Sequence, residues 1–144
     1  MEKNRKHNLL SAASCLILVG QSITACGHIE ANVPDAQDFR TFLVRDLNSY
    51  FGSKLQKNVN VEYELLRNGP TQTGIAWPKY YAWVRVYEGS KLIDQGAVRL
   101  AAVRKTEFGI TDFVSKTEIR KDAQSVQRIF PAALSPAIVA KANE

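Results

Sequence analysis

Between residues 35 and 52 the apolar residues recur every three or four positions, which is the period of an α-helix with one buried face. They are Ala36, Phe39, Leu43, Leu47, Tyr50 and Phe51. Asp35 follows a proline and suits the N-cap, and Gly52 is a natural stop after the last apolar pair. The pattern predicts one helix with an aromatic-rich face.

Downstream the period changes to two, which indicates half-buried strands. The predicted strands cover residues 59–66, 80–87, 92–105 and 108–114. A loop rich in Asn, Gly, Pro and Thr occupies residues 67–78, and residues 88–91 form a turn. Because Gly inside a strand often marks a bulge, one is expected at Asp94–Gly96. The whole run predicts an antiparallel meander.

Short helical turns are predicted after the last strand. Ser115 and Glu118 have the spacing of a capping box, and Asp122 can cap a second turn. Ser135 suits the N-cap of a third helix and Pro136 its first position. The predicted fold class is α+β: an N-terminal helix packed on a four-stranded antiparallel sheet, with short C-terminal helices. This order of elements resembles cystatin-like and nuclear-transport-factor-like cones. The resemblance concerns the fold alone and implies no particular activity.

The chain begins with a basic segment and an apolar run. Lys3, Arg5 and Lys6 precede an apolar stretch from Leu9 to Gly20, which polar residues follow. This is the three-part order of a secretory signal peptide. The apolar run is too short for a comfortable membrane span of about 20 residues. We therefore expect residues 1–25 to be removed on export, with a retained membrane anchor as the weaker alternative.

The predicted signal ends in Ile23-Thr24-Ala25-Cys26, which resembles the lipobox of bacterial lipoproteins. The resemblance implies cleavage before Cys26, diacylglycerol on its thiol, and an acyl chain such as palmitate on the new amino group. Thr24 departs from the commonest form, Leu-Ala-Gly-Cys, but stays within accepted variants. Gly27 stands where Asp would retain a lipoprotein in the inner membrane, which implies the outer membrane, periplasmic side. Ordinary cleavage after Ala25, giving a soluble periplasmic protein, is the alternative.

Cysteine usage favours lipidation. The sequence has two cysteines, and Cys15 lies inside the predicted signal. The processed chain would keep Cys26 alone, and a lone thiol in an oxidising compartment needs a reason, which acylation supplies. Residues 26–34 are then a tether of at most about 25–30 Å. Residues 35–144 form the predicted single domain.

Catalytic chemistry has little support in the predicted domain. The two histidines, His7 and His28, lie in the signal and the tether, which argues against Cys–His and Ser–His–Asp systems and the usual zinc ligand sets. Carboxylates remain, without the spacing of a catalytic pair or a calcium loop. They are Glu62, Glu64, Glu107, Asp112 and Glu118. No cofactor is expected.

The most distinctive stretch of the domain separates an apolar strand face from an aromatic and basic one. The second face consists of Tyr81, Trp83, Arg85 and Tyr87, with Arg99 one strand over. Such residues are common at binding hot spots, so this face is a candidate docking surface if it is open. The sequence favours the other interpretation, in which Trp83 belongs to a core under the C-terminal helices. Ile75 and Trp77 in the long loop have the same ambiguity between core plug and exposed anchor.

Three functional hypotheses follow. The first is a non-catalytic binding or envelope-assembly module, held at the membrane by its lipid, with a protein or envelope partner. The second is a small-ligand cavity between the predicted helix and the sheet, lined by Phe39, Tyr63 and Val84. The weakest is a carboxylate-dependent enzyme. The net charge of +5 belongs partly to the signal and argues against nucleic acid as a partner, while the oligomeric state is not predicted.

Overall fold

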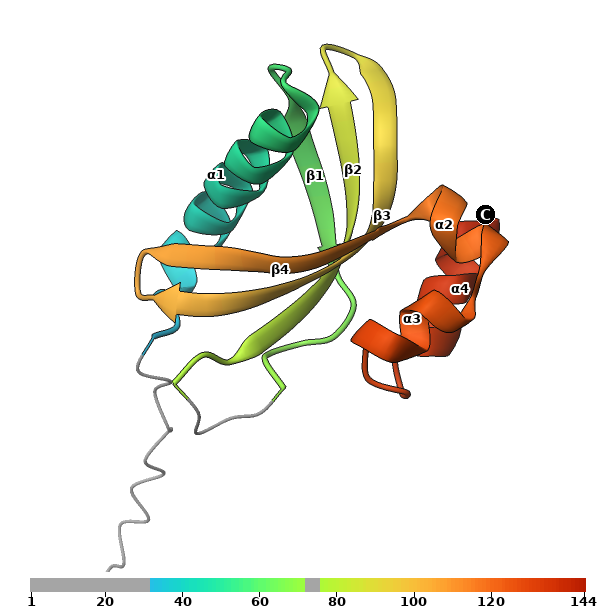
Figure 1. Ribbon diagram of the computed structural model, residues 1–144. Coiled ribbons are helices and arrows are strands. Elements are labelled where there is room, and N and C mark those ends of the chain that lie inside the picture. Colours follow the sequence, from blue (N-terminus) through green and yellow to red (C-terminus); the bar gives the residue numbers. More distant parts are fainter. Residues whose placement is uncertain (1–31, 72–75) are drawn as a thin grey trace, which may run out of the picture.

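The computed structural model describes residues 32–71 and 76–144, and Figure 1 shows their path. One long helix is followed by four strands and three short helices. The elements are α1 (Ala36–Leu55), β1 (Asn60–Leu65), β2 (Lys79–Glu88), β3 (Lys91–Arg104), β4 (Glu107–Ser115), α2 (Lys116–Lys121), α3 (Gln124–Ile129) and α4 (Ser135–Asn143). The predicted α+β class is confirmed, and the predicted strands lie within one residue of the observed ones.

Helix α1 begins after Asp35, as predicted, but continues beyond Gly52. The backbone carbonyl of Asp35 accepts the N–H of Phe39 at 2.9 Å, whereas its carboxylate makes no capping bond. At the other end, the side chain of Leu55 still packs against the core, which favours another turn. The helix ends where Gln56 adopts left-handed backbone, with φ of 53°. The predicted stop at Gly52 is therefore wrong.

The strands pair in sequence order, β1-β2-β3-β4, and every pair is antiparallel. β1 and β4 are thus the two edges of the sheet in the described part of the chain. Helix α1 contacts both of them, so it lies across the whole width of the sheet. This arrangement leaves the outer edges of β1 and β4 as the places where the sheet can meet another chain.

The irregularity expected at residues 94–96 has two parts. Ile93 has no partner on β2, so the bulge lies one residue before the predicted position. Gly96 itself is paired, and its lack of a side chain lets β4 approach β3 closely. A Cβ atom at Gly96 would lie 2.2 Å from the carbonyl oxygen of Val114, which is far inside van der Waals contact.

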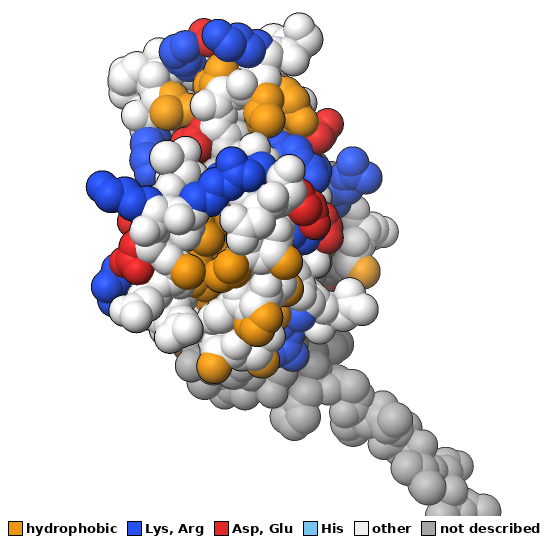
Figure 2. All heavy atoms as spheres, turned by 90° about the vertical axis from the view of Figure 1, so that its right-hand side faces the viewer, with side chains coloured by type: hydrophobic (Ala, Val, Ile, Leu, Met, Phe, Trp, Pro, Cys, Tyr) orange, Lys and Arg blue, Asp and Glu red, His pale blue; other side chains and the backbone are white. Residues whose placement is uncertain are grey.

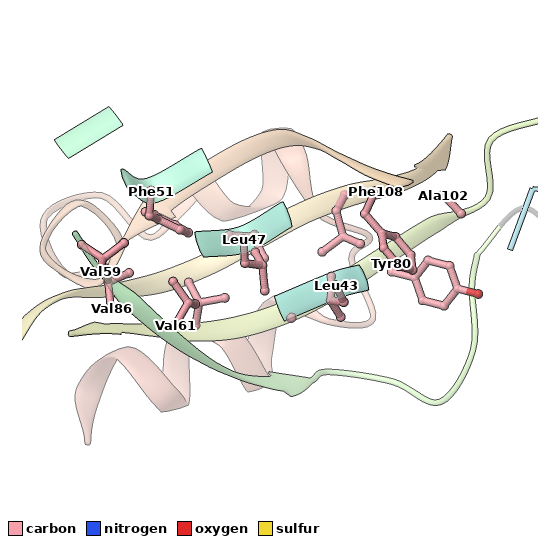
Figure 3. Close-up of a cluster of buried hydrophobic side chains, with 13 residues drawn as sticks. Leu43, Leu47, Phe51, Val59, Val61, Tyr80, Val86, Ala102 and Phe108 are labelled. Carbon is pink, nitrogen blue, oxygen red and sulfur yellow. The ribbon is translucent and has the colours of Figure 1, made fainter. Parts of the chain in front are cut away.

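Two separate cores cover the two faces of the sheet. On one face, Leu43, Leu47 and Phe51 of α1 lie over apolar side chains of the strands (Figure 3). On the other face, α2, α3 and α4 pack against residues of β2, β3 and β4. Because side chains alternate along β2, this strand contributes to both cores. Its even-numbered residues face α1, and its first odd-numbered apolar residues, Tyr81 and Trp83, are covered by the C-terminal helices.

The three C-terminal helices begin close to the predicted places. The Ser115 hydroxyl accepts the N–H of Glu118 at 3.2 Å, which confirms the predicted cap. Asp122 accepts the N–H of Gln124 with its carboxylate at 2.9 Å. Ser135 is the first residue of α4 rather than its cap, and its buried hydroxyl has no hydrogen-bond partner among the described residues. Within residues 32–71 and 76–144, no helix has the length and apolarity needed to cross a membrane.

Candidate functional site

The C-terminal helices divide the aromatic and basic face predicted on β2. Where they cover it, Tyr81 and Trp83 are only 5 % and 2 % exposed. Both pack in one cluster with apolar residues of the three helices, Ile119, Val126 and Ile138 among them, and with Phe130, which directly follows α3. Figure 2 looks onto this side of the molecule, where the helices present Lys and Arg side chains among hydrophobic ones. The interpretation that the sequence favours, with Trp83 in a core under the C-terminal helices, is confirmed, and an open docking face at Tyr81 and Trp83 is wrong.

Arg99 is occupied by structural contacts. Its guanidinium bonds to the Asp112 carboxylate through two nitrogens, at 2.6 and 2.7 Å, and donates to the carbonyl of Ile129 at 3.2 Å. These bonds join β3 to β4 and to the end of α3. Of the five residues of the predicted face, only Arg85 and Tyr87 lie beyond the C-terminal helices, and both are half-buried.

The predicted loop residues have different outcomes. Ile75 lies outside the described residues, as does Cys26 with the whole predicted signal and most of the tether. Trp77 is described and is 55 % exposed, so its side chain is not a plug over the core. The carbonyl of its neighbour, Ala76, accepts a hydrogen bond from the side-chain amide of Asn32.

A hollow of about 550 Å³ lies between α1 and the outer edge of β1. It is lined by Arg40, Val44, Asn60, Val61, Glu62, Tyr63 and Arg85. A second hollow, of about 380 Å³, lies toward the beginning of α1. It is lined by Val33, Pro34, Ala36, Phe39, Arg40, Leu65, Gly69 and Tyr80. Arg40 lines both hollows, so they adjoin along β1. We call them together the β1 groove.

The helix side of the β1 groove is a single stripe of α1. Ala36, Arg40 and Val44 are four residues apart, which places them one above another on the same side of a helix. Asn48 continues the stripe at the upper end, and its side-chain oxygen accepts the backbone N–H of Val61 at 2.8 Å. The stripe thus runs beside the strand edge until Asn48 closes it.

The strand side of the groove carries unpaired backbone groups. The backbone N–H of Leu66 donates to the carbonyl of Tyr81 on β2, within the sheet. The N–H of Val61 points away from β2 and donates to the side-chain oxygen of Asn48. Because hydrogen bonding alternates along an antiparallel strand, the N–H groups of Tyr63 and Leu65 point outward as well. No bond from the described residues occupies them. The edge of β1 therefore offers two donors and the carbonyls beside them.

The groove has a positive side. Arg40 and Arg85 line it, and neither forms an ion pair with a carboxylate of the described residues. Glu62, exposed on β1, is the acidic residue in the same lining. Burial raises the pKa of the Tyr63 phenol, and the positive charge of Arg40 partly opposes this. Tyr63 is half-buried, and it lies within electrostatic reach of Arg40.

The space between α1 and the middle of the sheet is filled. Val84, expected to line a ligand cavity, is fully buried in the same core cluster as Leu43 and Leu47 of α1. Phe39 packs edge-to-face on Tyr80 and on Phe108, with ring centroids 5.1 and 4.9 Å apart. Tyr63 is half-buried and lines the β1 groove instead. The predicted lining of Phe39, Tyr63 and Val84 therefore does not enclose one cavity, and the hollow that the fold does form lies at the sheet edge.

The acidic residues considered for catalysis are dispersed. Glu64 pairs with Lys141 at 2.7 Å, Glu107 with Arg104 at 3.5 Å, and Asp112 with Arg99. Glu62 and Glu118 are exposed on different elements. In the part of the chain that the structure describes, no three His, Cys, Asp or Glu side chains gather as a metal site would require.

Comparison of the chain with protein-family models, with curated proteins and with solved structures finds no match. Its candidate site is therefore defined by its own geometry. The sequence analysis missed the β1 groove, although one sign was present: Arg40 stands on the helix stripe with Ala36 and Val44, where a wholly buried helix face would carry apolar residues.

Proposed function

We propose that this chain is a lipid-anchored protein of the bacterial cell envelope whose domain binds an extended segment of a partner protein in the β1 groove. The open outer edge of β1 is the observation that carries the binding part of the proposal. The lipobox-like residues 23–26 support the anchoring part, on the periplasmic side of the outer membrane. The domain acts by docking, without a cofactor.

The binding mode is strand addition. An extended segment lying along β1 would receive hydrogen bonds from the N–H groups of Tyr63 and Leu65 and donate to the carbonyls beside them. The α1 stripe forms the other wall and would contact the side chains of the segment that point away from solvent. Backbone pairing supplies affinity in such complexes, and the side-chain contacts supply selectivity.

The charges of the groove select the chemistry of the segment. Arg40 and Arg85 are available for charge-assisted hydrogen bonds, which carboxylates accept in a bidentate manner. At the lower end, Val33, Phe39 and Leu65 offer an apolar surface. The segment that fits is extended, with at least one acidic side chain toward the upper half of the groove and an apolar one toward the lower half.

Anchoring is tested by the mass of the protein extracted from membranes. The expected mass is that of residues 26–144 plus acyl chains, and a Cys26→Ser variant should lose the acyl chains and the membrane attachment. An unmodified mass for the wild-type chain, with full release into the soluble periplasm, would leave only the alternative of ordinary cleavage after Ala25.

Docking is tested by cross-linking in intact cells. A photo-reactive residue placed at Glu62, in the groove, should cross-link to a short acidic segment of one envelope protein. The matched control is the same residue at Gln127, which is exposed on α3 and does not line the groove. A synthetic peptide of that segment should compete for the cross-link, and charge reversal of Arg40 and Arg85 should reduce its affinity about tenfold or more. Equal cross-linking at the two positions, or cross-linking to a second copy of this chain alone, would contradict the proposal.

A further inference from the structure

Trp77 is a large exposed side chain placed at one end of the domain. Among the described residues, two large hydrophobic side chains are exposed, Trp77 at 55 % and Leu92 at 41 %. Trp77 precedes β2, and Leu92 follows the hairpin at its other end. Since β2 has ten residues, the two side chains lie at opposite ends of the sheet, about 30 Å apart.

The end that carries Trp77 is the end where the chain enters the domain. The side chain of Asn32 donates to the carbonyl of Ala76, the residue before Trp77. Pro34, two residues after Asn32 and just before α1, is buried. In Figure 1 the chain leading into α1, the segment before β2 and the β3–β4 hairpin lie near one another at the lower left of the domain. The carbonyl of Pro78 accepts the N–H of Ala102, which fixes this hairpin beside Trp77.

The distance to the proposed lipid is short. Asn32 lies six positions after Cys26, and a fully extended chain covers at most about 20 Å over that length. A domain held this closely can turn only a limited part of its surface toward the bilayer. Charge does not attract this end of the domain to a membrane, because it carries the acidic residues Asp35 and Asp38 as well as the basic residues Arg104 and Lys105. The indole ring is therefore the feature that would bind.

We infer that Trp77 inserts into the headgroup region of the phospholipid membrane that carries the anchored N-terminus, and that this second contact orients the domain. Tryptophan is enriched at this depth because its ring is apolar and its N–H can still bond to polar groups. One aromatic residue binds a free membrane weakly. A weak contact is sufficient here, because the tether keeps the local concentration of membrane around the domain high. In this orientation the apolar end of the β1 groove is nearest the membrane, and the end with Arg85 is farthest.

The inference rests on anchoring at Cys26 and does not depend on what occupies the groove. Its test uses the processed protein from cells, reconstituted in vesicles of phosphatidylethanolamine and phosphatidylglycerol that contain brominated lipids. If its mass shows no acyl chain, the Cys26 thiol is first coupled to a maleimide phospholipid. The mass thus reports on the proposed anchoring, while the fluorescence reports on Trp77.

The readout is the Trp77 emission, obtained as the difference between wild-type protein and a Trp77→Phe variant that retains the buried Trp83. On reconstitution this emission should shift to shorter wavelength and lose most of its intensity to the brominated lipids. The matched control is Leu92→Trp in the Trp77→Phe background, whose emission should stay that of an indole in water. If the Trp77 emission is unshifted, and is quenched by aqueous acrylamide but not by brominated lipid, the inference is overturned.

Discussion

The side-chain oxygen of Asn48 accepts the backbone N–H of Val61 at 2.8 Å, so helix α1 occupies one outward donor of edge strand β1. Asp46, two residues earlier, accepts the N–H of Phe108 on the opposite edge strand at 2.7 Å. The helix that covers the sheet therefore also blocks a position on each edge. On β1 the blocked position is followed by the open donors of Tyr63 and Leu65, and this boundary defines where a partner strand can pair.

Replacing Asn48 by Ala should lower the free energy of unfolding by about 1–2 kcal/mol, because the partly buried N–H of Val61 loses its acceptor. Urea unfolding monitored by circular dichroism measures the change. Asn48→Asp keeps an acceptor oxygen at the same place and should cost less. An Ala variant as stable as the wild type would show that this bond does not fasten the edge of β1.

The two tryptophans should respond in opposite ways to truncation. Trp83→Ala should destabilise the protein by about 3–5 kcal/mol, because it opens a cavity in the core beneath α2–α4. Trp77→Ala should change the free energy of unfolding by less than about 0.5 kcal/mol, because its side chain is exposed. Denaturant unfolding of both variants side by side measures this difference. A Trp83→Ala protein of wild-type stability would contradict the assignment of Trp83 to the core.

The pKa of Tyr63 tests the geometry of the β1 groove. Burial raises this pKa, and the charge of Arg40 lowers it. Arg40→Gln removes a positive charge that favours the phenolate, so the pKa of Tyr63 should rise further. The ring resonances of Tyr63, followed by NMR as the pH is raised, give the value in both proteins. An unchanged or lowered pKa would mean that Arg40 does not face the Tyr63 ring.

Asp94 should make stability depend on pH. Burial raises its carboxyl pKa above the ordinary 3.8, although the Gln95 N–H and Lys54 oppose the shift. The folded state then holds this proton more tightly than the unfolded state. This contribution to stability is fully present at pH values below the ordinary pKa of 3.8 and is lost as the pH rises through the pKa of the folded state.

Asp94→Asn removes the titrating group and keeps an oxygen that can accept the N–H of Gln95. The stability of this variant relative to the wild type should therefore be greater at neutral pH than at a pH well below the ordinary carboxyl pKa. Thermal unfolding across this range measures the difference. A constant difference between the two proteins at all pH values would contradict the raised pKa.

Local patterns along the chain predict most of the fold. Alternation fixes all four strands because each has at least one buried face, and the cap at Ser115 follows from its spacing to Glu118. The end of α1 was missed because tertiary packing of Leu55 outweighs the tendency of Gly52 to stop a helix. The role of Gly96 was missed because the close approach of β4 depends on the register of two strands.

The candidate site is less predictable, because it depends on which surfaces remain uncovered. Alternation identifies Trp83 and Arg85 as neighbours on one face but cannot tell that the C-terminal helices cover only the first. The β1 groove likewise depends on β1 being an edge strand and on α1 lying across it. Neither fact is local in sequence. Cys26 is a different case, since the motif around it is local and is tested by chemistry rather than by the fold.

Amide hydrogen exchange at Tyr63 and Leu65 tests the proposed docking most directly. In the free protein, these two amides should exchange faster than the paired amides of Glu62 and Glu64 on the same strand. With the cross-linked acidic segment bound as a peptide, exchange at Tyr63 and Leu65 should slow by about tenfold or more, as for amides paired in a sheet. Unchanged exchange at both amides with the peptide bound would contradict strand addition to β1.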